Sequence, residues 1–258
     1  MRETEAHTCG SYLRNRGPLL HMFRTLPGML FELFLVPAHV IRQERDWKRL
    51  LPRIPSLKYF PSKRKVIEAS LRGPYQDYVS NYSSPLISLS LNRAAFLNYL
   101  TRATNAGHIL DLGSGFSSYV FRRARADTSA GNVISVDDSE QWLEETRSFL
   151  RHYHLEDAHL YALDQMSDPG GQFTPGRFDL CLIDIGDFAL RAKLLPTLLE
   201  AVRGGSIVLI DDFHVTRYRK HIIAQCAVTN VDVFSLRKVT RRRLSHMAII
   251  MQKAAEDS

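Results

Sequence analysis

The sequence has few cysteines, and this excludes two kinds of cysteine-based architecture. Cys9, Cys181 and Cys226 are its three cysteines, and they are widely spaced and odd in number. A disulfide framework needs paired cysteines, and a structural zinc site usually contains closely spaced pairs. Neither is expected here, and free thiols favour a reducing compartment such as the cytoplasm.

A long hydrophobic run is also missing. The most apolar stretch, residues 29–41, is interrupted by Glu32 and Pro37 and is shorter than the roughly 20 residues needed to cross a bilayer. No small-residue cleavage site follows it cleanly, so it does not read as a signal peptide. Basic residues flank the stretch, so it could lie on an anionic membrane or dock a partner. The simpler interpretation is that it covers a sheet or lines a substrate pocket.

Strand signals are scarce in the first part of the chain, which is also the basic part. Residues 1–80 hold 14 Lys and Arg against 7 Asp and Glu, whereas the rest of the chain holds 20 of each. Prolines recur through this region and predict short helices joined by irregular chain. We therefore expect residues 1–106 to form a helical N-terminal extension that packs on a sheet or covers its open edge.

From residue 107 onward, short apolar runs alternate with helical patterns. The expected strands are residues 108–113, 132–137, 159–163, 178–184, 206–212, 231–236 and 246–252. Helical patterns over residues 139–153 and 189–203 join some of the first five, which implies parallel pairing. Asp138 followed by Gln141 predicts a capping box at the start of the first of these helices.

The last two expected strands are predicted to pair antiparallel. The segment between them is short and strongly basic, so it does not suit a packed crossover helix, and an antiparallel hairpin is expected. The prediction for residues 107–258 is an α/β, doubly wound, Rossmann-like domain with a mostly parallel seven-stranded sheet and an antiparallel C-terminal hairpin.

The stretch "DLGSG", residues 111–115, follows the first expected strand. In a doubly wound sheet this is where ligands bind, and glycines allow the backbone to turn sharply and approach a ligand closely. Asp137 ends the second expected strand, where a carboxylate can accept both hydroxyls of a ribose. Together these features indicate a nucleoside-containing cofactor.

Two such cofactors have to be distinguished, NAD and S-adenosylmethionine. A dinucleotide site needs the third glycine of GxGxxG, and here that position is Ser118. Asp111 would repel a pyrophosphate but can help to organise the cationic amino acid end of S-adenosylmethionine. The second cofactor is therefore favoured.

Residues 108–252 resemble the class I S-adenosylmethionine-dependent methyltransferases. The resemblance lies in five motifs in the expected order: "DLGSG", "SVDDS", "ALDQM", "FDLCLID" and "VRGGSIVLIDD". The resemblance implies contacts to the cofactor from Asp111, Gly113, Ser114, Gly115, Asp137, Asp138, Asp164 and Asp184. Within this set the glycines would cradle the cofactor, Asp137 would hold the ribose and Asp164 would lie near the adenine. The chain departs from the family at Ser117, where a third glycine often stands.

The resemblance also suggests a divalent metal. In the family the fourth and fifth strands are neighbours, so Asp184, Asp211 and Asp212 would lie close together and could bind Mg²⁺. This arrangement resembles the small-molecule O-methyltransferases that use a metal, including the catechol-type and sugar-type branches. The alternative gives Asp184 a cofactor-side or structural role and makes Asp212 a helix cap.

The general base is left open by the sequence. Some relatives carry a histidine in the version "IDGDH" of the fourth motif, and this chain has Asp187 at that place. The catalytic candidates are therefore Asp184, Asp187 and His214.

The predicted function is methyl transfer from S-adenosylmethionine to a hydroxyl of a small molecule or sugar. A nucleic-acid substrate is the alternative, because residues 217–221 and 237–243 are basic. Neither an NPPY-like motif nor a proline–cysteine pair supports it. A third hypothesis is a non-catalytic scaffold docked to a membrane or partner through the N-terminal segment. The oligomeric state is not predicted.

Overall fold

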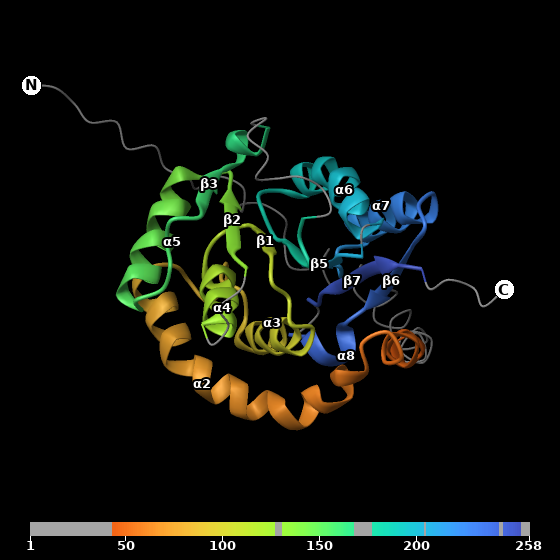
Figure 1. Ribbon diagram of the computed structural model, residues 1–258, viewed down its shortest axis with the longest axis horizontal. Coiled ribbons are helices and arrows are strands. Elements are labelled where there is room, and N and C mark those ends of the chain that lie inside the picture. The colour runs from red at the N-terminus through yellow and green to blue at the C-terminus, as the bar shows by residue number, and fades with distance from the viewer. Residues whose placement is uncertain (1–42, 127–130, 168–176, 204, 243–244, 254–258) are drawn as a thin grey trace, which may run out of the picture. The chain divides into compact units, whose positions relative to one another are not determined.

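The computed structural model describes residues 43–126, 131–167, 177–203, 205–242 and 245–253 (Figure 1). The apolar stretch at residues 29–41, for which a membrane or docking role was considered, lies outside these residues. The described helices and strands form a sheet with helices on both faces.

The sheet confirms the predicted fold class. Its seven strands are β1 (Ile109–Leu112), β2 (Val133–Asp137), β3 (Leu160–Ala162), β4 (Leu180–Ile183), β5 (Ile207–Ile210), β6 (Val231–Ser235) and β7 (Ala248–Gln252). They are ordered β3-β2-β1-β4-β5-β7-β6. The five strands from β3 to β5 are parallel, and β7 runs antiparallel to both of its neighbours. The predicted C-terminal hairpin is β6 and β7.

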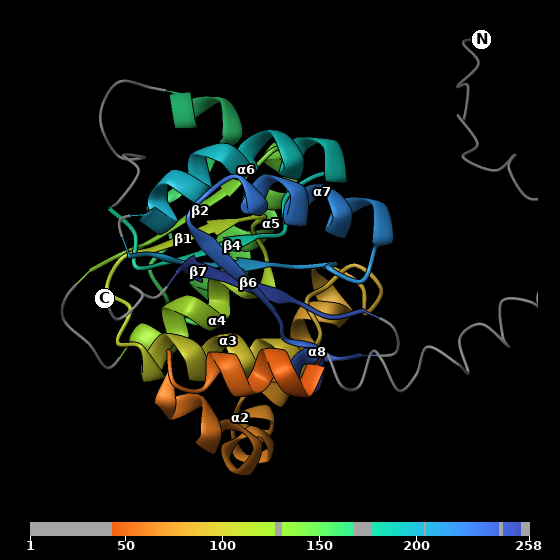
Figure 2. The same cartoon turned by 90° about the vertical axis from the view of Figure 1, so that its right-hand side faces the viewer.

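Helices cover both faces of this sheet (Figure 2). The described helical elements are η1 (Pro55–Tyr59), α2 (Phe60–Asn81), α3 (Leu91–Ala103), α4 (Phe116–Arg125), α5 (Glu140–His152), η2 (Leu163–Ser167), α6 (Phe188–Arg203), α7 (Thr216–Ala227) and α8 (Arg237–Thr240). Side chains that alternate along each strand point to opposite faces. Ile109 therefore packs with α3, α4 and α5, whereas Leu110 belongs to the core under α6 and α7. Buried strands explain the continuous apolar runs in the sequence.

The described part of the N-terminal region is helical, as expected, but its helices are longer than predicted. Residues 43–50 are helical, and α2 is one helix of 22 residues despite Pro61 and Pro74. Pro61 stands in the first turn, where the missing N–H has no partner inside the helix, and Pro74 is tolerated within it. None of the described helices is both long and apolar enough to cross a membrane.

Three local features differ from the sequence predictions or were not anticipated. Ser139, and not Asp138, caps α5, because its hydroxyl accepts the N–H of Trp142 at 3.3 Å. The basic stretch at residues 217–221 lies in α7, a helix that was not predicted. The connection between β6 and β7 contains the single turn α8.

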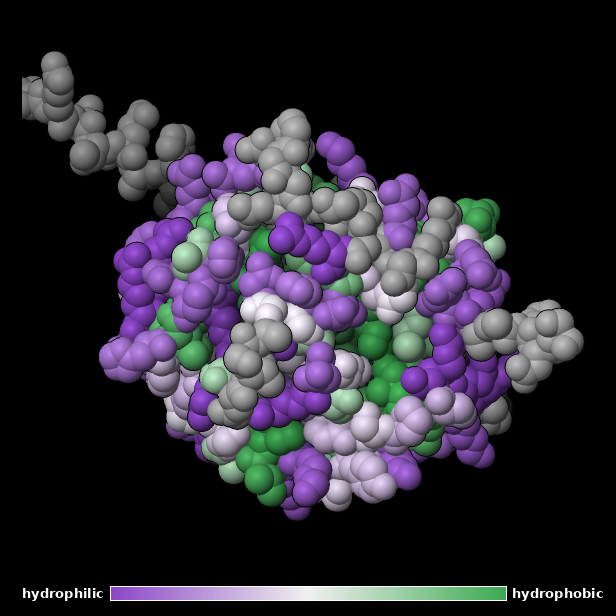
Figure 3. All heavy atoms as spheres, viewed as in Figure 1, coloured by the Kyte–Doolittle hydropathy of each residue, from purple (hydrophilic) through white to green (hydrophobic). Residues whose placement is uncertain are grey.

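The molecular face seen in Figure 3 bears mostly hydrophilic side chains, and its hydrophobic residues form small separate patches. A domain that buries its apolar residues inside two helix–sheet interfaces leaves such a surface.

Candidate functional site

A cavity of about 1040 Å³ opens where β1, β2, β4 and β5 end. The segments that follow these four strands all contribute side chains to its wall, and so do the end of α2 and the loop between α2 and α3. Ligands of doubly wound sheets bind at this edge, where the strand order reverses between β1 and β4.

The glycine loop after β1 packs closely against residues that are distant in the sequence. Gly113 has φ +105°, and a Cβ there would lie 2.4 Å from the carbonyl oxygen of Asp184. Gly115 has φ +139°, and a Cβ there would lie 2.7 Å from the hydroxyl of Tyr78. Both glycines are thus required by backbone conformation and by close packing. The backbone of Gly113 and Ser114 remains on the cavity wall.

Asp137 ties the ends of β1 and β2 together at the cavity. One carboxylate oxygen accepts the backbone N–H of Ser114 at 2.7 Å and its hydroxyl at 2.9 Å, and the other accepts the N–H of Ser139 at 3.0 Å. Burial raises the pKa of Asp137, and the bonds from Ser114 oppose that rise. Asp138 and Trp142 line the same side of the cavity.

Asp111 lies beneath the glycine loop and does not line the cavity. It is fully buried, and one of its oxygens accepts hydroxyl bonds from Ser118 at 2.6 Å and Ser135 at 3.2 Å. Its second oxygen has no hydrogen-bond partner. Burial raises the pKa of Asp111 to about 6, although Ser118, Ser117 and Arg122 favour its charged form. The structure thus gives Asp111 a role in organising the loop.

The buried position of Asp111 makes stability depend on pH. Its pKa of about 6 in the fold exceeds the ordinary value of 3.8, so the fold favours the protonated carboxyl. The stabilisation this provides is lost as the pH rises from about 4 through about 6. Relative to Asp111→Asn, the wild type is expected to lose about 2 kcal/mol of unfolding free energy between pH 4 and pH 7, measured by urea unfolding. Asp138→Asn, at an exposed position, is the control, and a pH-independent difference for Asp111→Asn would contradict the prediction.

Asp184, Asp211 and Asp212 line the cavity at the ends of β4 and β5. β5 ends at Ile210 and Asp212 has φ +54°, so two consecutive aspartates can face the same cavity. Burial and the neighbouring carboxylates raise the pKa of Asp184 well above its ordinary value, and Arg191 opposes this. Burial also raises the pKa of Asp211, and Arg93 opposes this.

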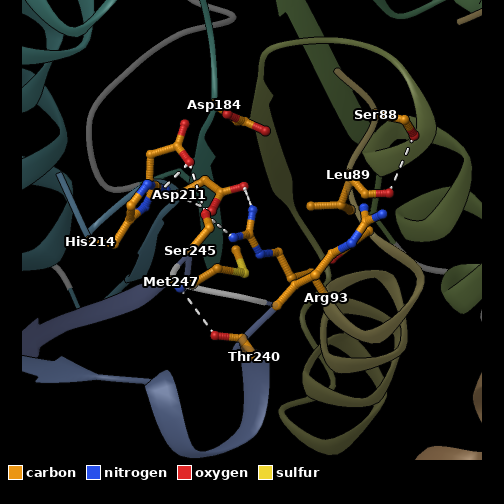
Figure 4. Close-up of polar contacts among 12 residues, drawn as sticks. Ser88, Leu89, Arg93, Asp184, Asp211, His214, Thr240, Ser245 and Met247 are labelled. Atoms are coloured by element: carbon orange, nitrogen blue, oxygen red, sulfur yellow. Dashed lines mark hydrogen bonds and ion pairs between the residues drawn. The ribbon is translucent and has the colours of Figure 1, made fainter. Parts of the chain in front are cut away.

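The carboxylates are paired with arginines instead of facing one another across an open site. Arg93 donates to Asp211 at 2.6 Å (Figure 4). Arg191 lies 2.9 Å from Asp184 and 3.4 Å from Asp212. Among the described residues, no group of three His, Cys, Asp or Glu side chains is arranged to hold a metal ion. The donor set therefore does not fit the Mg²⁺ site suggested by the sequence.

The remaining predicted residues fall in different places. His214 lines the cavity, with its Nδ1 3.7 Å from a carboxylate oxygen of Asp212. Asp187 is exposed and does not line the cavity; its carboxylate accepts the N–H of Leu190 at 2.8 Å in the first turn of α6. Asp164 lies in η2 after β3 and is also outside the cavity wall. Of the three catalytic candidates, Asp184 and His214 line the cavity.

Solved structures with the same fold include several O-methyltransferases. The O-methyltransferase TomG from Streptomyces achromogenes, involved in tomaymycin synthesis and solved in complex with SAM, is 16% identical, with a TM-score of 0.55 over 69% of this chain and 87% of that chain. An O-methyltransferase from Bacillus cereus in complex with SAH is 18% identical, with a TM-score of 0.55 over 71% and 91%. A putative O-methyltransferase from Klebsiella pneumoniae is 18% identical, with a TM-score of 0.56 over 73% and 90%.

A family model described as a methyltransferase domain matches residues 110–213, which run from β1 to just beyond β5. This match and the shared fold support an S-adenosylmethionine-dependent methyltransferase. No curated protein matches it.

Two residues of this methyltransferase site, Arg93 and Arg191, were missed in the sequence. Arg191 precedes Leu195, Leu198, Leu199 and Val202, which are buried residues of α6 at helical spacing. An arginine in phase with such a stripe must be buried, and a buried guanidinium needs carboxylate or carbonyl partners. This spacing was the signal from which the burial of Arg191 could have been predicted. Arg93 has the same position relative to the buried residues of α3.

Proposed function

We propose that this methyltransferase binds S-adenosylmethionine in the cavity at the ends of β1, β2, β4 and β5 and transfers its methyl group to a hydroxyl of a small molecule. The observation that carries the proposal is the meeting of the Gly113–Ser114 backbone, the Asp137 carboxylate and the acidic ends of β4 and β5 in one cavity of about 1040 Å³. The O-methyltransferase neighbours support this choice of chemistry.

The cofactor half of the cavity has the groups that S-adenosylmethionine needs. Gly113 and Ser114 offer half-buried backbone on the cavity wall, Asp137 and Asp138 offer carboxylate acceptors for ribose hydroxyls, and Trp142 offers an aromatic surface. When bound, the cofactor supplies a methyl group on a positively charged sulfur. The role of the chain is then to position the acceptor and to receive its proton.

The acceptor half combines an apolar edge with a polar end. Leu86 and Ile87 line the cavity from the loop between α2 and α3, with exposed fractions of 92% and 71%. His214 and Asp212 lie at the polar end. An acceptor that carries both an apolar part and a hydroxyl would use both edges, which favours a small amphiphilic molecule over a bare sugar.

Proton transfer completes the reaction. As the bond from the acceptor oxygen to the methyl carbon forms and the bond from that carbon to sulfur breaks, the hydroxyl proton leaves. His214 is the proposed base because a neutral imidazole can accept a proton near pH 7 and the nearby Asp212 would stabilise the resulting charge. The use of Asp187 in α6 capping argues against it as the base.

Calorimetric titration of the wild-type protein tests the proposal. We expect S-adenosylmethionine and S-adenosylhomocysteine to bind with micromolar affinity and NAD to bind at least about tenfold more weakly, since Ser118 stands where a dinucleotide site has its third glycine. Methyl transfer to a panel of amphiphilic phenols and alcohols, detected by mass spectrometry as a gain of one methyl group, identifies the acceptor. A folded protein that binds neither S-adenosylmethionine nor S-adenosylhomocysteine would refute the proposal.

A further inference from the structure

Two buried arginines occupy the region where three aspartates meet at the ends of β4 and β5. Each guanidinium comes from a different side of the sheet, Arg93 from α3 and Arg191 from α6. Both arginine side chains are 8% exposed, whereas Asp184 and Asp212 remain 25% and 30% exposed toward the cavity. The positive charges are therefore more buried than the carboxylates of Asp184 and Asp212.

Arg191 is held by contacts from all three of its guanidinium nitrogens. Its Nε donates to the carbonyl oxygen of Ile185 at 2.9 Å, and one terminal nitrogen lies 2.9 Å from Asp184. The other terminal nitrogen lies 3.4 Å from Asp212. One side chain thus bridges the ends of β4 and β5. A planar guanidinium suits this role because its donors are fixed in a fork.

Arg93 closes the other end of the cluster. It donates to Asp211 at 2.6 Å and to the hydroxyl of Ser245, which in turn donates to Asp212 at 3.1 Å. Figure 4 shows Arg93 reaching Asp211 and Ser245 from one side, with His214 on the other side of Asp211. The three carboxylates are therefore joined into one network with two permanent positive charges.

We propose that Arg191 and Arg93 provide the positive charge that a divalent cation would otherwise supply to Asp184, Asp211 and Asp212, so that this site works without a metal ion. A cation that entered the cluster would have to displace a guanidinium or lie close to one. The first needs a buried arginine to lose its carboxylate partners, and the second places like charges together. The inference about catalysis rests on the proposed function, whereas the inference about metal binding does not.

Arg191 is then a positioning residue. Its guanidinium contacts Asp212, and Asp212 lies beside His214. Arg191 therefore positions the polar groups of the acceptor half of the cavity. The ion pair between Arg191 and Asp184 also holds the segment after β4, whose backbone packs against Gly113. One arginine thereby links the acceptor end of the cavity to the glycine loop.

Direct measurement of Mn²⁺ binding by electron paramagnetic resonance tests the proposal without requiring any activity. The wild type is expected to leave Mn²⁺ free at concentrations up to about 1 mM. Arg191→Met frees two carboxylates and is expected to bind Mn²⁺ at least about tenfold more tightly than the wild type. Arg191→Lys keeps the charge and is expected to behave like the wild type. The double variant Arg191→Met, Asp212→Asn should lose the gained binding.

Each result decides the question. Micromolar Mn²⁺ binding by the wild type that Asp184→Asn abolishes would overturn the proposal, and so would a folded Arg191→Met variant that gains no binding. If Arg191→Met does not fold, Arg93→Met gives the same test from the other arginine, through Asp211. Once an acceptor is known, wild-type turnover should be unchanged by EDTA, and a loss of more than about tenfold would contradict metal independence. Failure of S-adenosylmethionine to bind would refute the proposed function alone, since the Mn²⁺ measurement does not involve the cofactor.

Discussion

Replacement of Arg122 by methionine is expected to lower the free energy of unfolding by about 3–5 kcal/mol, the cost of removing one partner from a buried ionic network. Arg122 lies in α4 and is 5% exposed. It donates to the carbonyl oxygens of Glu156 at 2.7 Å and Val133 at 3.1 Å, and to the hydroxyl of Ser135 at 2.9 Å. Methionine fills a similar volume but removes the donor to the buried carbonyl oxygen of Val133 and the buried hydroxyl of Ser135.

The same substitution removes the positive charge nearest to Asp111. Arg122 favours the charged form of Asp111, so without it the pKa of that carboxyl should rise further. Urea unfolding at pH 7 measures the loss. Arg123→Met, at the neighbouring exposed position of the same helix, is the matched control and should change stability little. A loss of less than about 1 kcal/mol for Arg122→Met would show that the network does not stabilise the fold.

Asp137→Ala is expected to weaken S-adenosylmethionine binding by about 100-fold. Two hydrogen bonds from ribose hydroxyls to a carboxylate, at about 1.5 kcal/mol each, account for a loss of this size. Alanine also releases the N–H and hydroxyl of Ser114, which Asp137 holds at 2.7 and 2.9 Å. Calorimetric titration of the cofactor into the variant measures the effect.

Two further variants separate ribose binding from loop positioning. Ser114→Ala removes the hydroxyl bond to Asp137 but keeps the backbone bond and the carboxylate, so its affinity should fall by less than about tenfold. Asp157→Ala, whose carboxylate pairs with Arg151 on the surface, should bind the cofactor like the wild type. Unchanged affinity in a folded Asp137→Ala variant would remove Asp137 from the cofactor site.

The central strands β1, β2, β4 and β5 were predicted well from the sequence because all of their residues are buried. A run such as "FDLCLID" is apolar on both faces, and only a buried strand or helix explains it. The expected parallel order also followed from the helices between strands. Helix lengths were harder to predict. Pro74 indicates a helix break in the sequence, but α2 continues through it. Tertiary packing of α2 on α3, where the rings of Phe60 and Phe96 lie 5.3 Å apart, outweighs the local cost.

The candidate site was predicted only in part, because the sequence places residues at strand ends more reliably than residues that reach the site from helices. Gly113 and Asp184 directly follow strands and Asp137 ends one, so their place at the sheet edge could be predicted from the sequence. Arg93 and Arg191 reach the same place from helices, and nothing local to a helix says which strand end its side chain will meet. The metal hypothesis counted the carboxylates without these two counter-charges.

Tyr78 has a consequence for where the cofactor-binding unit begins. Its ring packs 4.9 Å from that of Phe149 and 5.5 Å from that of Phe116, and its hydroxyl fills the space beside Gly115. A chain cut at residue 106 would keep every strand and every methyltransferase motif, yet it would lose the wall against which the glycine loop is packed. Helix α2 therefore forms one side of the proposed cofactor site, and we expect a fragment that binds a nucleoside cofactor to begin before this helix.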